Sequence, residues 1–205
     1  MRDAAFIEAV SLEDGPTRVA ALAAWLQSLA PTTEESPVLV GGGAVELYSG
    51  GAYRTGDLDF VGRLGEEGER QLEAAGFRRR GRHWIHEEHQ IFLEFPSDHL
   101  QEGESAAIIK VGEYSVVVIG LEELIVDRLA AWRFWSSEID AVNAVRLIQG
   151  SAADLDPARL REIAEDRGVA PALRALEQFV EGLGGREPSS QELDEWTRRG
   201  SGGTS

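Results

Sequence analysis

The chain of 205 residues contains no cysteine. Disulfide bonds, thiol catalysis and zinc–thiolate sites are therefore excluded. A composition without cysteine is consistent with a reducing cytoplasm, although a secreted protein that lacks disulfides would share it. No stretch approaches the ~20 apolar residues that a membrane-spanning helix needs, and the N-terminus lacks the basic and apolar regions of a secretory signal. We therefore expect a cytoplasmic protein with no membrane partner.

Positive charge is also scarce. Lysine and arginine number 20 against 36 aspartates and glutamates, which gives a formal net charge of −16. This charge argues against indiscriminate binding to nucleic acid or to an anionic membrane. The local exception is the basic run from Arg78 to His83 (RRRGRH), which could bind an RNA backbone. The same run could equally be a solvated strand edge whose charges discourage edge-to-edge pairing.

Hydrophobic residues make up 42% of the chain, enough for a substantial core. The hydrophobic pattern predicts an α+β fold with three parts: a core of strands and helices in 1–120, a helical part in 121–199, and a disordered tail in 200–205. We expect Trp132 and Trp135 to lie in the core of the helical part. The predicted helices cover 17–29, 65–76, 121–136, 137–149, 156–168, 170–183 and 188–199. The predicted strands cover 38–40, 57–61, 77–84, 90–95, 106–111 and 114–119.

Three consecutive glycines, Gly41, Gly42 and Gly43, follow a short apolar run and precede an amphipathic one. This pattern predicts a strand, a tight turn and the start of a helix. Backbone N–H groups at such a turn, together with the positive end of the helix dipole, form a cradle for phosphate. Glycine allows the phosphates to approach the backbone closely.

Two aspartates belong to the next predicted strand. Asp57 and Asp59 project to the same side of it, about 6–7 Å apart at their backbones, while Leu58 and Phe60 face the core. Two carboxylates at this spacing can bind a divalent cation. A phosphate cradle beside them is the arrangement that binds a nucleoside triphosphate with Mg²⁺.

The glycine turn followed by Asp57-x-Asp59, with Arg54 and Thr55 just before it, resembles the nucleotidyltransferase superfamily that shares a polymerase-β-type core. The closest resemblance is to small bacterial members, including the nucleotidyltransferase-like toxins of toxin–antitoxin and abortive-infection systems. It is close over residues 37–62 and weaker over 90–150. It implies a mixed, mostly antiparallel nucleotidyltransferase sheet flanked by helices, with a helical extension at the C-terminal side.

The resemblance also implies roles for residues of the site. The superfamily carries a third carboxylate on a strand beside the two aspartates, and Glu94 matches that position, with Asp98 as the alternative. Asp57, Asp59 and Glu94 would then hold one or two Mg²⁺ ions. From the residues alone, Glu94 could instead be a glutamate of an edge strand that faces solvent.

Residues that would hold the triphosphate follow from the same resemblance. The three glycines would bind the β- and γ-phosphates, assisted by Arg54 or Thr55. Arg128, in the predicted helix 121–136, could contact the triphosphate as well, or it could form a surface ion pair on an amphipathic helix. Asp140 matches a position that is often acidic in the relatives.

We therefore expect a Mg²⁺-dependent enzyme that transfers a nucleotide from a nucleoside triphosphate to a hydroxyl group. The acceptor could be RNA such as the 3′ end of tRNA, a protein side chain or a small molecule, and a toxin-like role would add an antitoxin protein as a partner. The alternative is a non-catalytic nucleotide-binding or antitoxin-type module on the same fold. The spacing of His83, His86 and His89 places neighbours on opposite strand faces, which argues against a histidine metal site.

Overall fold

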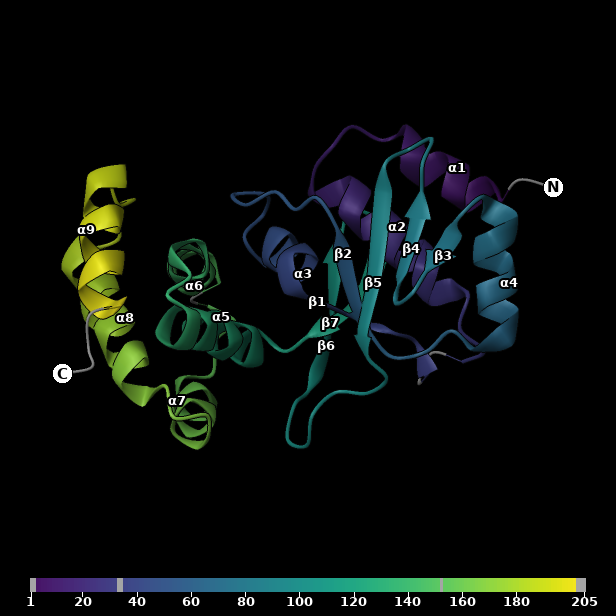
Figure 1. Ribbon diagram of the computed structural model, residues 1–205. Coiled ribbons are helices and arrows are strands. Elements are labelled where there is room, and N and C mark those ends of the chain that lie inside the picture. Colours follow the sequence, from purple (N-terminus) through teal and green to yellow (C-terminus); the bar gives the residue numbers. More distant parts are fainter. Residues whose placement is uncertain (1–2, 33–34, 152, 202–205) are drawn as a thin grey trace. The chain divides into compact units, whose positions relative to one another are not determined.

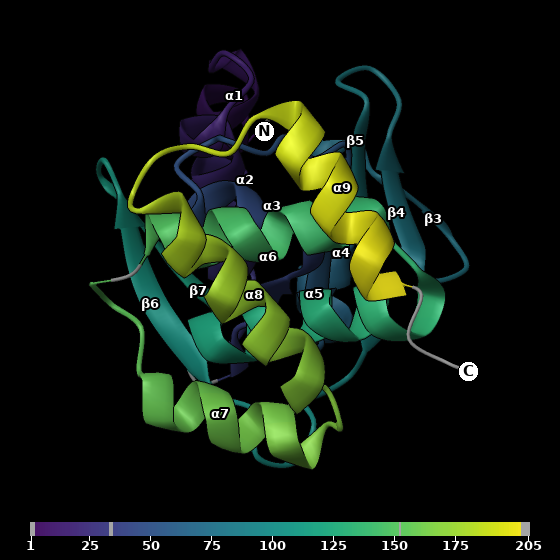
Figure 2. The same ribbon diagram turned by 90° about the vertical axis from the view of Figure 1, so that its left-hand side faces the viewer.

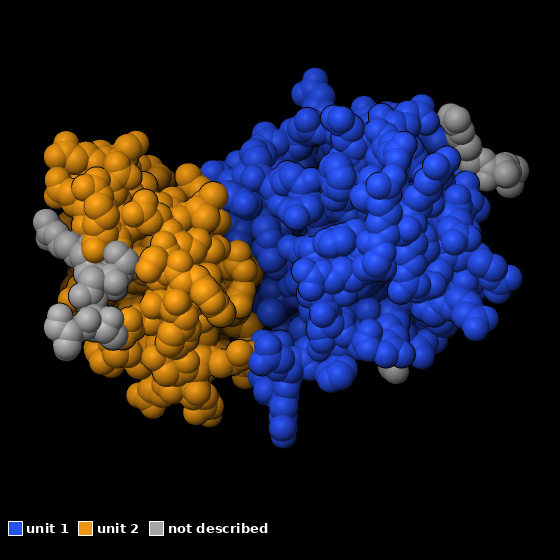
Figure 3. All heavy atoms as spheres, in the orientation of Figure 1, with its two compact units in different colours: residues 1–120 blue, residues 121–205 orange. Residues whose placement is uncertain are grey.

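The computed structural model describes residues 3–32, 35–151 and 153–201. The chain divides into two compact units, Met1–Gly120 and Leu121–Ser205 (Figure 3). The division falls at residue 120, where the hydrophobic pattern also divides the chain. Of the predicted tail 200–205, Gly200 and Ser201 end a helix, and the remaining four residues lie outside the described ones. No helix among the described residues is long and apolar enough to cross a membrane.

Unit 1 is built on one seven-stranded sheet with the order β3-β4-β5-β2-β1-β7-β6. Four neighbouring pairs are antiparallel, and the pairs β1–β7 and β2–β5 are parallel. The prediction of an α+β fold with a mixed, mostly antiparallel sheet is therefore confirmed. The strands are β1 (Val38–Val40), β2 (Leu58–Val61), β3 (Arg78–Arg80), β4 (His83–His86), β5 (Ile91–Ser97), β6 (Ala106–Val111) and β7 (Tyr114–Ile119).

Helices cover one face of this sheet, which we call the covered face (Figure 1). Leu39, Leu58, Phe60 and Leu93 point toward them, and each is at most 4% exposed. The alternate residues of the same strands, including Asp59, point to the other face, which we call the open face. The helices of unit 1 are α1 (Ala4–Ser11), α2 (Pro16–Ser28), α3 (Gly41–Tyr48) and α4 (Gly65–Ala75).

Two features of unit 1 differ from the predictions. Helix α1 was not predicted, and its N-terminus is stabilised by Asp3, whose carboxylate accepts bonds from the Ala5 N–H at 3.0 Å and the Trp25 indole at 2.7 Å. The predicted strand 77–84 is two strands, because the chain reverses at Gly81 with φ of 66°. Glycine adopts this left-handed conformation without strain.

Unit 2 consists of helices in its described part (Figure 2). Trp132 is 2% exposed and packs against Trp196, with ring centroids 4.4 Å apart, as expected for a core residue. The prediction for Trp135 was wrong: the ring is 76% exposed, because α5 ends at this residue and the chain turns at Ser136. The helices are α5 (Leu121–Trp135), α6 (Glu138–Gly150), α7 (Pro157–Asp166), α8 (Ala170–Leu183) and α9 (Ser190–Ser201).

Candidate active site

The glycine turn joins β1 directly to the first turn of α3. Val40 is the N-cap residue, and its side chain supplies no hydrogen bond to the first N–H groups of the helix. Gly41 has φ of 60°, and a Cβ added there would overlap Oδ2 of Asp59. A Cβ on Gly42 would lie 2.5 Å from Oγ1 of Thr55. The first two glycines therefore bring the helix N-terminus into contact with Asp59 and Thr55.

Gly43 has a different environment. A Cβ on it would lie 3.0 Å from Leu39 and 3.1 Å from Leu58, both of which are core residues of the covered face. The absence of a side chain there allows α3 to pack closely on the sheet. Gly43 thus serves the packing of the helix, whereas Gly41 faces Asp59 and Gly42 faces Thr55.

Asp57 lies immediately before β2 and is exposed. The hydroxyl of Thr55 donates to its backbone carbonyl at 2.8 Å, or to its Oδ1 at 3.2 Å. Asp59, two residues further on, is half-buried on the open face. Thr55 therefore orients Asp57 by a short local turn, and its predicted contact with phosphate stays a prediction.

Glu94 lies level with Asp59, because β2 and β5 are parallel neighbours with these two residues in register. Their backbones are separated by the usual strand spacing of ~4.8 Å. The sheet therefore brings the predicted third carboxylate next to the aspartates on the open face. The alternative, Asp98, is exposed and forms an ion pair with Arg63. The hydrogen bond from the Arg63 guanidinium holds the pKa of Asp98 below its usual value.

Both oxygens of Glu94 have neighbours from the adjacent hairpin. Nε of Arg82 lies 2.7 Å from Oε1, and Nδ1 of His83 lies 3.5 Å from Oε2. The Glu94 side chain is 18% exposed, so this contact is partly shielded from water. Among the described residues, no group of three acidic or histidine side chains is arranged to hold a metal ion. Asp57, Asp59 and Glu94 thus share one face of the sheet without converging on one point.

The donor set nevertheless fits a magnesium ion. Mg²⁺ prefers carboxylate oxygens, binds through one or two of them and keeps several water ligands. Asp57 and Asp59 supply two carboxylates next to the helix N-terminus, where phosphate would bind. Glu94 would become a further ligand only after its contact with Arg82 opens.

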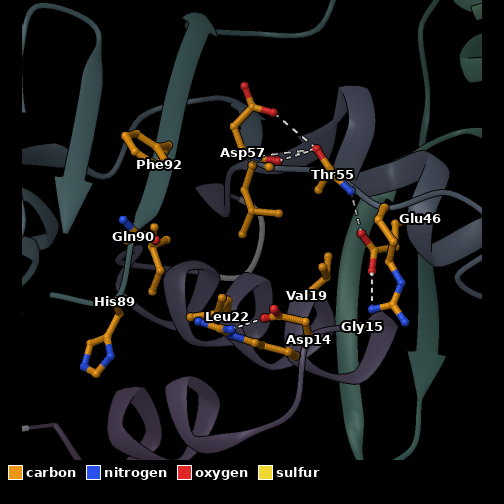
Figure 4. A pocket seen from close by; sticks show the side chains of 15 residues that line it. Asp14, Gly15, Val19, Leu22, Glu46, Thr55, Asp57, His89, Gln90 and Phe92 are labelled. Atoms are coloured by element: carbon orange, nitrogen blue, oxygen red, sulfur yellow. Dashed lines mark hydrogen bonds and ion pairs between the residues drawn. The ribbon is translucent and has the colours of Figure 1, made fainter. Parts of the chain in front are cut away.

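A cavity of about 570 Å³ lies beside Asp57 (Figure 4). Its lining combines the start of α2, the loop before β2 and the start of β5. Phe92 and Asp57 lie at one side of it, and Asp14 lies near α2. Core residues such as Leu58 and Ile91 also line the cavity, so it lies between α2 and the sheet, and Asp57 belongs to its edge.

Glu46, on α3, is a functional candidate that the sequence patterns did not indicate. It is 1% exposed, and its Oε2 accepts a hydrogen bond from the Thr55 N–H at 2.9 Å. Its Oε1 has no hydrogen-bond partner and lies 3.8 Å from Nη1 of Arg54. Burial raises the pKa of this carboxyl. The available signal was a single acidic residue inside the amphipathic run 44–48.

Arg54 lies between α3 and the start of α2. Its guanidinium lies near Glu46 and also against Gly15, where an added Cβ would be 2.8 Å from Nη1. The side chain is 57% exposed, so one side of it remains accessible to a ligand. The predicted phosphate contact of Arg54 stays a prediction.

Arg128, the remaining predicted ligand of the triphosphate, belongs to unit 2. Its Nη1 lies 2.8 Å from Oδ1 of Asp140, and it also pairs with Asp127. The side chain is 17% exposed. Two carboxylates therefore neutralise Arg128 within its own unit, and its contact with triphosphate stays a prediction.

No protein-family model, curated protein or solved structure matches this chain. The function therefore has to be argued from the residues of the site.

Proposed function

We propose that the protein transfers a nucleotide from a Mg²⁺-bound nucleoside triphosphate to a hydroxyl acceptor. The observation that carries the proposal is the contact of the glycine turn with Asp59, together with its link to Asp57 through Thr55. Asp59 lies against Gly41 at the start of α3, and Thr55 links Gly42 to Asp57. Phosphate bound at the helix N-terminus would therefore lie beside two carboxylates on one face of the sheet.

The first turn of α3 would bind the phosphates. Its N–H groups point along the helix axis and carry the positive end of the helix dipole. The side chain of the N-cap residue, Val40, does not compete for them. Magnesium held by Asp57 and Asp59 would neutralise phosphate charge and lower the pKa of the acceptor hydroxyl.

The reaction is an in-line displacement. The hydroxyl oxygen of the acceptor attacks the α-phosphorus, the bond from that phosphorus to the bridging oxygen breaks, and pyrophosphate leaves. A carboxylate of the site accepts the hydroxyl proton. Glu94 would serve for this task once its contact with Arg82 opens. It lies on the side of Asp59 away from the glycine turn, because β5 and β1 flank β2 on opposite sides.

The second candidate is a binding module without turnover, in which the site holds a nucleotide but does not react. The contacts of Glu94 with Arg82 and His83 favour it, because they occupy both oxygens of the third carboxylate. A site that keeps these contacts has only Asp57 and Asp59 for cations.

The test uses each nucleoside triphosphate labelled at the α-phosphate, with Mg²⁺ and a cell lysate. Transfer of label by the wild-type protein, and its loss in Asp57→Ala/Asp59→Ala, is the expected result. Calorimetry with each Mg²⁺–triphosphate complex separates the two candidates. Binding without transfer supports the module, and the absence of both binding and transfer contradicts the two candidates together.

A further inference from the structure

The open face carries a continuous row of polar side chains that crosses four strands. Arg80 on β3 is in register with His83 on β4, His83 with Glu94 on β5, and Glu94 with Asp59 on β2. Residues in register on neighbouring strands point to the same face. The row therefore begins at an arginine on the edge of the sheet and ends at a carboxylate of the candidate active site.

A second row runs beside the first. Arg78 on β3 is in register with Ile85 on β4, and Ile85 with Phe92 on β5. Phe92 lines the cavity together with Asp57 (Figure 4). Two rows of side chains thus lead from arginines at the edge of the sheet to the two aspartates.

Phe92, the second residue of β5, is an unusual strand residue because its ring is 44% exposed. Its neighbours in sequence, Ile91 and Leu93, are 5% and 2% exposed on the covered face. An accessible aromatic ring with an aliphatic neighbour, Ile85, offers a surface on which a planar base can stack.

The arginines of β3 divide between the two faces of the sheet. Arg79 belongs to the covered face, where it pairs with Glu69 at 3.0 Å and lies over the ring of Trp84. Arg78 and Arg80 belong to the open face. Arg80 contacts Glu87 at 3.4 Å, but both side chains are about two-thirds exposed, and such surface pairs contribute little. Among the described residues, Arg78 forms no ion pair.

This placement concentrates positive charge in a protein of net charge −16. Arg78, Arg80 and the neighbouring Arg82 lie at one edge of the sheet, each with an exposed side chain. In a chain whose bulk charge repels polyanions, a cationic edge next to an accessible aromatic ring fits a ligand that combines phosphate groups with bases.

The reaction geometry gives the direction in which such a ligand would lie, and this step rests on the proposed function. The leaving pyrophosphate would remain at the glycine turn, on the β1 side of the aspartates. In-line displacement requires the attacking hydroxyl to approach from the opposite side. That side is occupied by β5, β4 and β3, in this order.

We infer that the acceptor is the 3′ end of a single-stranded polynucleotide lying across the open face. Its phosphates pair with Arg78 and Arg80, one base stacks on Phe92, and the terminal hydroxyl reaches Asp57 and Asp59. Adjacent strands are ~4.8 Å apart, so the path from β3 to β2 has room for a few nucleotides. A base must be unpaired to stack on an aromatic ring, which selects a single strand over a duplex.

The chemical step then extends the strand by one nucleotide. The 3′-hydroxyl oxygen forms a bond to the α-phosphorus, pyrophosphate leaves, and the hydroxyl proton passes to a carboxylate of the site. Arg82 has a part in this step as a positioning residue. The approach of a strand phosphate to Arg82 would draw the guanidinium from Glu94 and free that carboxylate.

Binding is measured by fluorescence anisotropy with the full-length protein and 5′-labelled oligonucleotides: single-stranded RNA, single-stranded DNA and the corresponding duplexes. We expect either single strand to bind at least about tenfold more tightly than its duplex. The double variant Arg78→Glu/Arg80→Glu should weaken binding more than tenfold and reduce the slope against salt by about two, one for each phosphate contact. Arg70→Glu, which changes an exposed arginine on α4, should leave binding unaltered.

Phe92→Ala should weaken single-strand binding about tenfold without changing the salt slope, and Phe92→Trp should restore it. Comparing the RNA strand with the DNA strand shows which of the two polynucleotides this surface binds. Extension of the labelled strand by one nucleotide, in the presence of Mg²⁺ and a triphosphate, is the expected product.

The outcomes separate this inference from the proposed function. If the protein binds Mg²⁺–triphosphate but Arg78→Glu/Arg80→Glu behaves like Arg70→Glu, the polynucleotide acceptor is overturned and nucleotide transfer stands. Label that appears on a protein or a small molecule likewise overturns the polynucleotide acceptor and leaves nucleotide transfer intact. If the single strand binds as expected but no triphosphate does, nucleotide transfer fails, and with it the acceptor role of the surface.

Discussion

The covered and open faces of the sheet are made from alternate residues of the same strands, but their side chains differ in kind. On β2, Leu58 and Phe60 are 4% and 0% exposed, and Asp59 between them belongs to the open face. On β5, Leu93 is 2% exposed, and Phe92 before it is 44% exposed. A period of two therefore separates residues that stabilise the fold from residues available for chemistry.

This separation has a consequence for mutation. Side chains on the covered face stabilise the fold by removing apolar area from water. Truncating one of them should therefore lower the free energy of unfolding. Side chains on the open face are in contact with solvent and with each other. Removing one of them should therefore lower activity more than stability. Four predictions test whether the two faces differ in this way.

The largest effect is expected from Phe60→Ala. The ring is fully buried against the helices, and its removal should lower the free energy of unfolding by about 3–5 kcal/mol. Phe92→Ala, one strand away on the open face, should cost less than about 1 kcal/mol. Urea denaturation followed by tryptophan fluorescence measures both. Equal losses for the two variants would show that the open face is also part of the core.

Asp59→Asn should lower activity and leave stability nearly unchanged, which is the reverse of the effect of Phe60→Ala. We expect nucleotide transfer to fall at least about a hundredfold, the size of effect found when a group that stabilises developing charge is removed. The free energy of unfolding should change by less than about 1 kcal/mol. The matched control is Asp98→Asn, an exposed carboxylate bonded to Arg63, which should retain activity. Loss of activity in the control alone would identify Asp98 as the third carboxylate.

Gly41→Ala probes the contact between the helix N-terminus and Asp59. Gly50 is the control, because both glycines have φ of 60° but an added Cβ at Gly50 meets open space. Both variants should lose about 1–2 kcal/mol of stability from the left-handed conformation. Only Gly41→Ala displaces Asp59, and it should reduce transfer about tenfold or more. Equal activity of the two variants would separate the glycine turn from the site.

The smallest effect is expected at Glu46, a carboxylate on the helical side. Its pKa is raised in the folded state by burial, so the folded protein holds this proton more tightly than the unfolded chain. The free energy of unfolding should therefore fall as the pH rises above the ordinary value of 4.5. Glu46→Gln removes this contribution, so its stability relative to the wild type should increase from pH 4.5 to pH 7. Parallel curves for the two proteins would contradict the assignment.

Several parts of the site could be predicted from the sequence because they depend on local rules. The strand at 57–61 places Asp57 and Asp59 on one side by alternation alone. The glycines after an apolar run predict the start of α3, and the alternation of β5 places Glu94 opposite its core residues. Each of these predictions uses positions only a few residues apart.

Other parts required contacts between distant segments. The pairing of Glu94 with Arg82 arises because β4 and β5 form an antiparallel hairpin, in a register that the sequence leaves open. The accessibility of Phe92 depends on which strand face the helices cover. The burial of Glu46 under the Thr55 loop depends on how that loop folds back on α3.

The sequence by itself determined the period of each strand, the glycine turn and the order of the charged residues, because these properties follow from backbone geometry and from neighbouring side chains. Only the tertiary structure decided which strands are neighbours and in which register. That choice depends on burying Leu39, Leu58, Phe60 and Leu93 against the helices together, a gain shared among segments far apart in the chain. It brings Arg80, His83 and Glu94 into one row with Asp59.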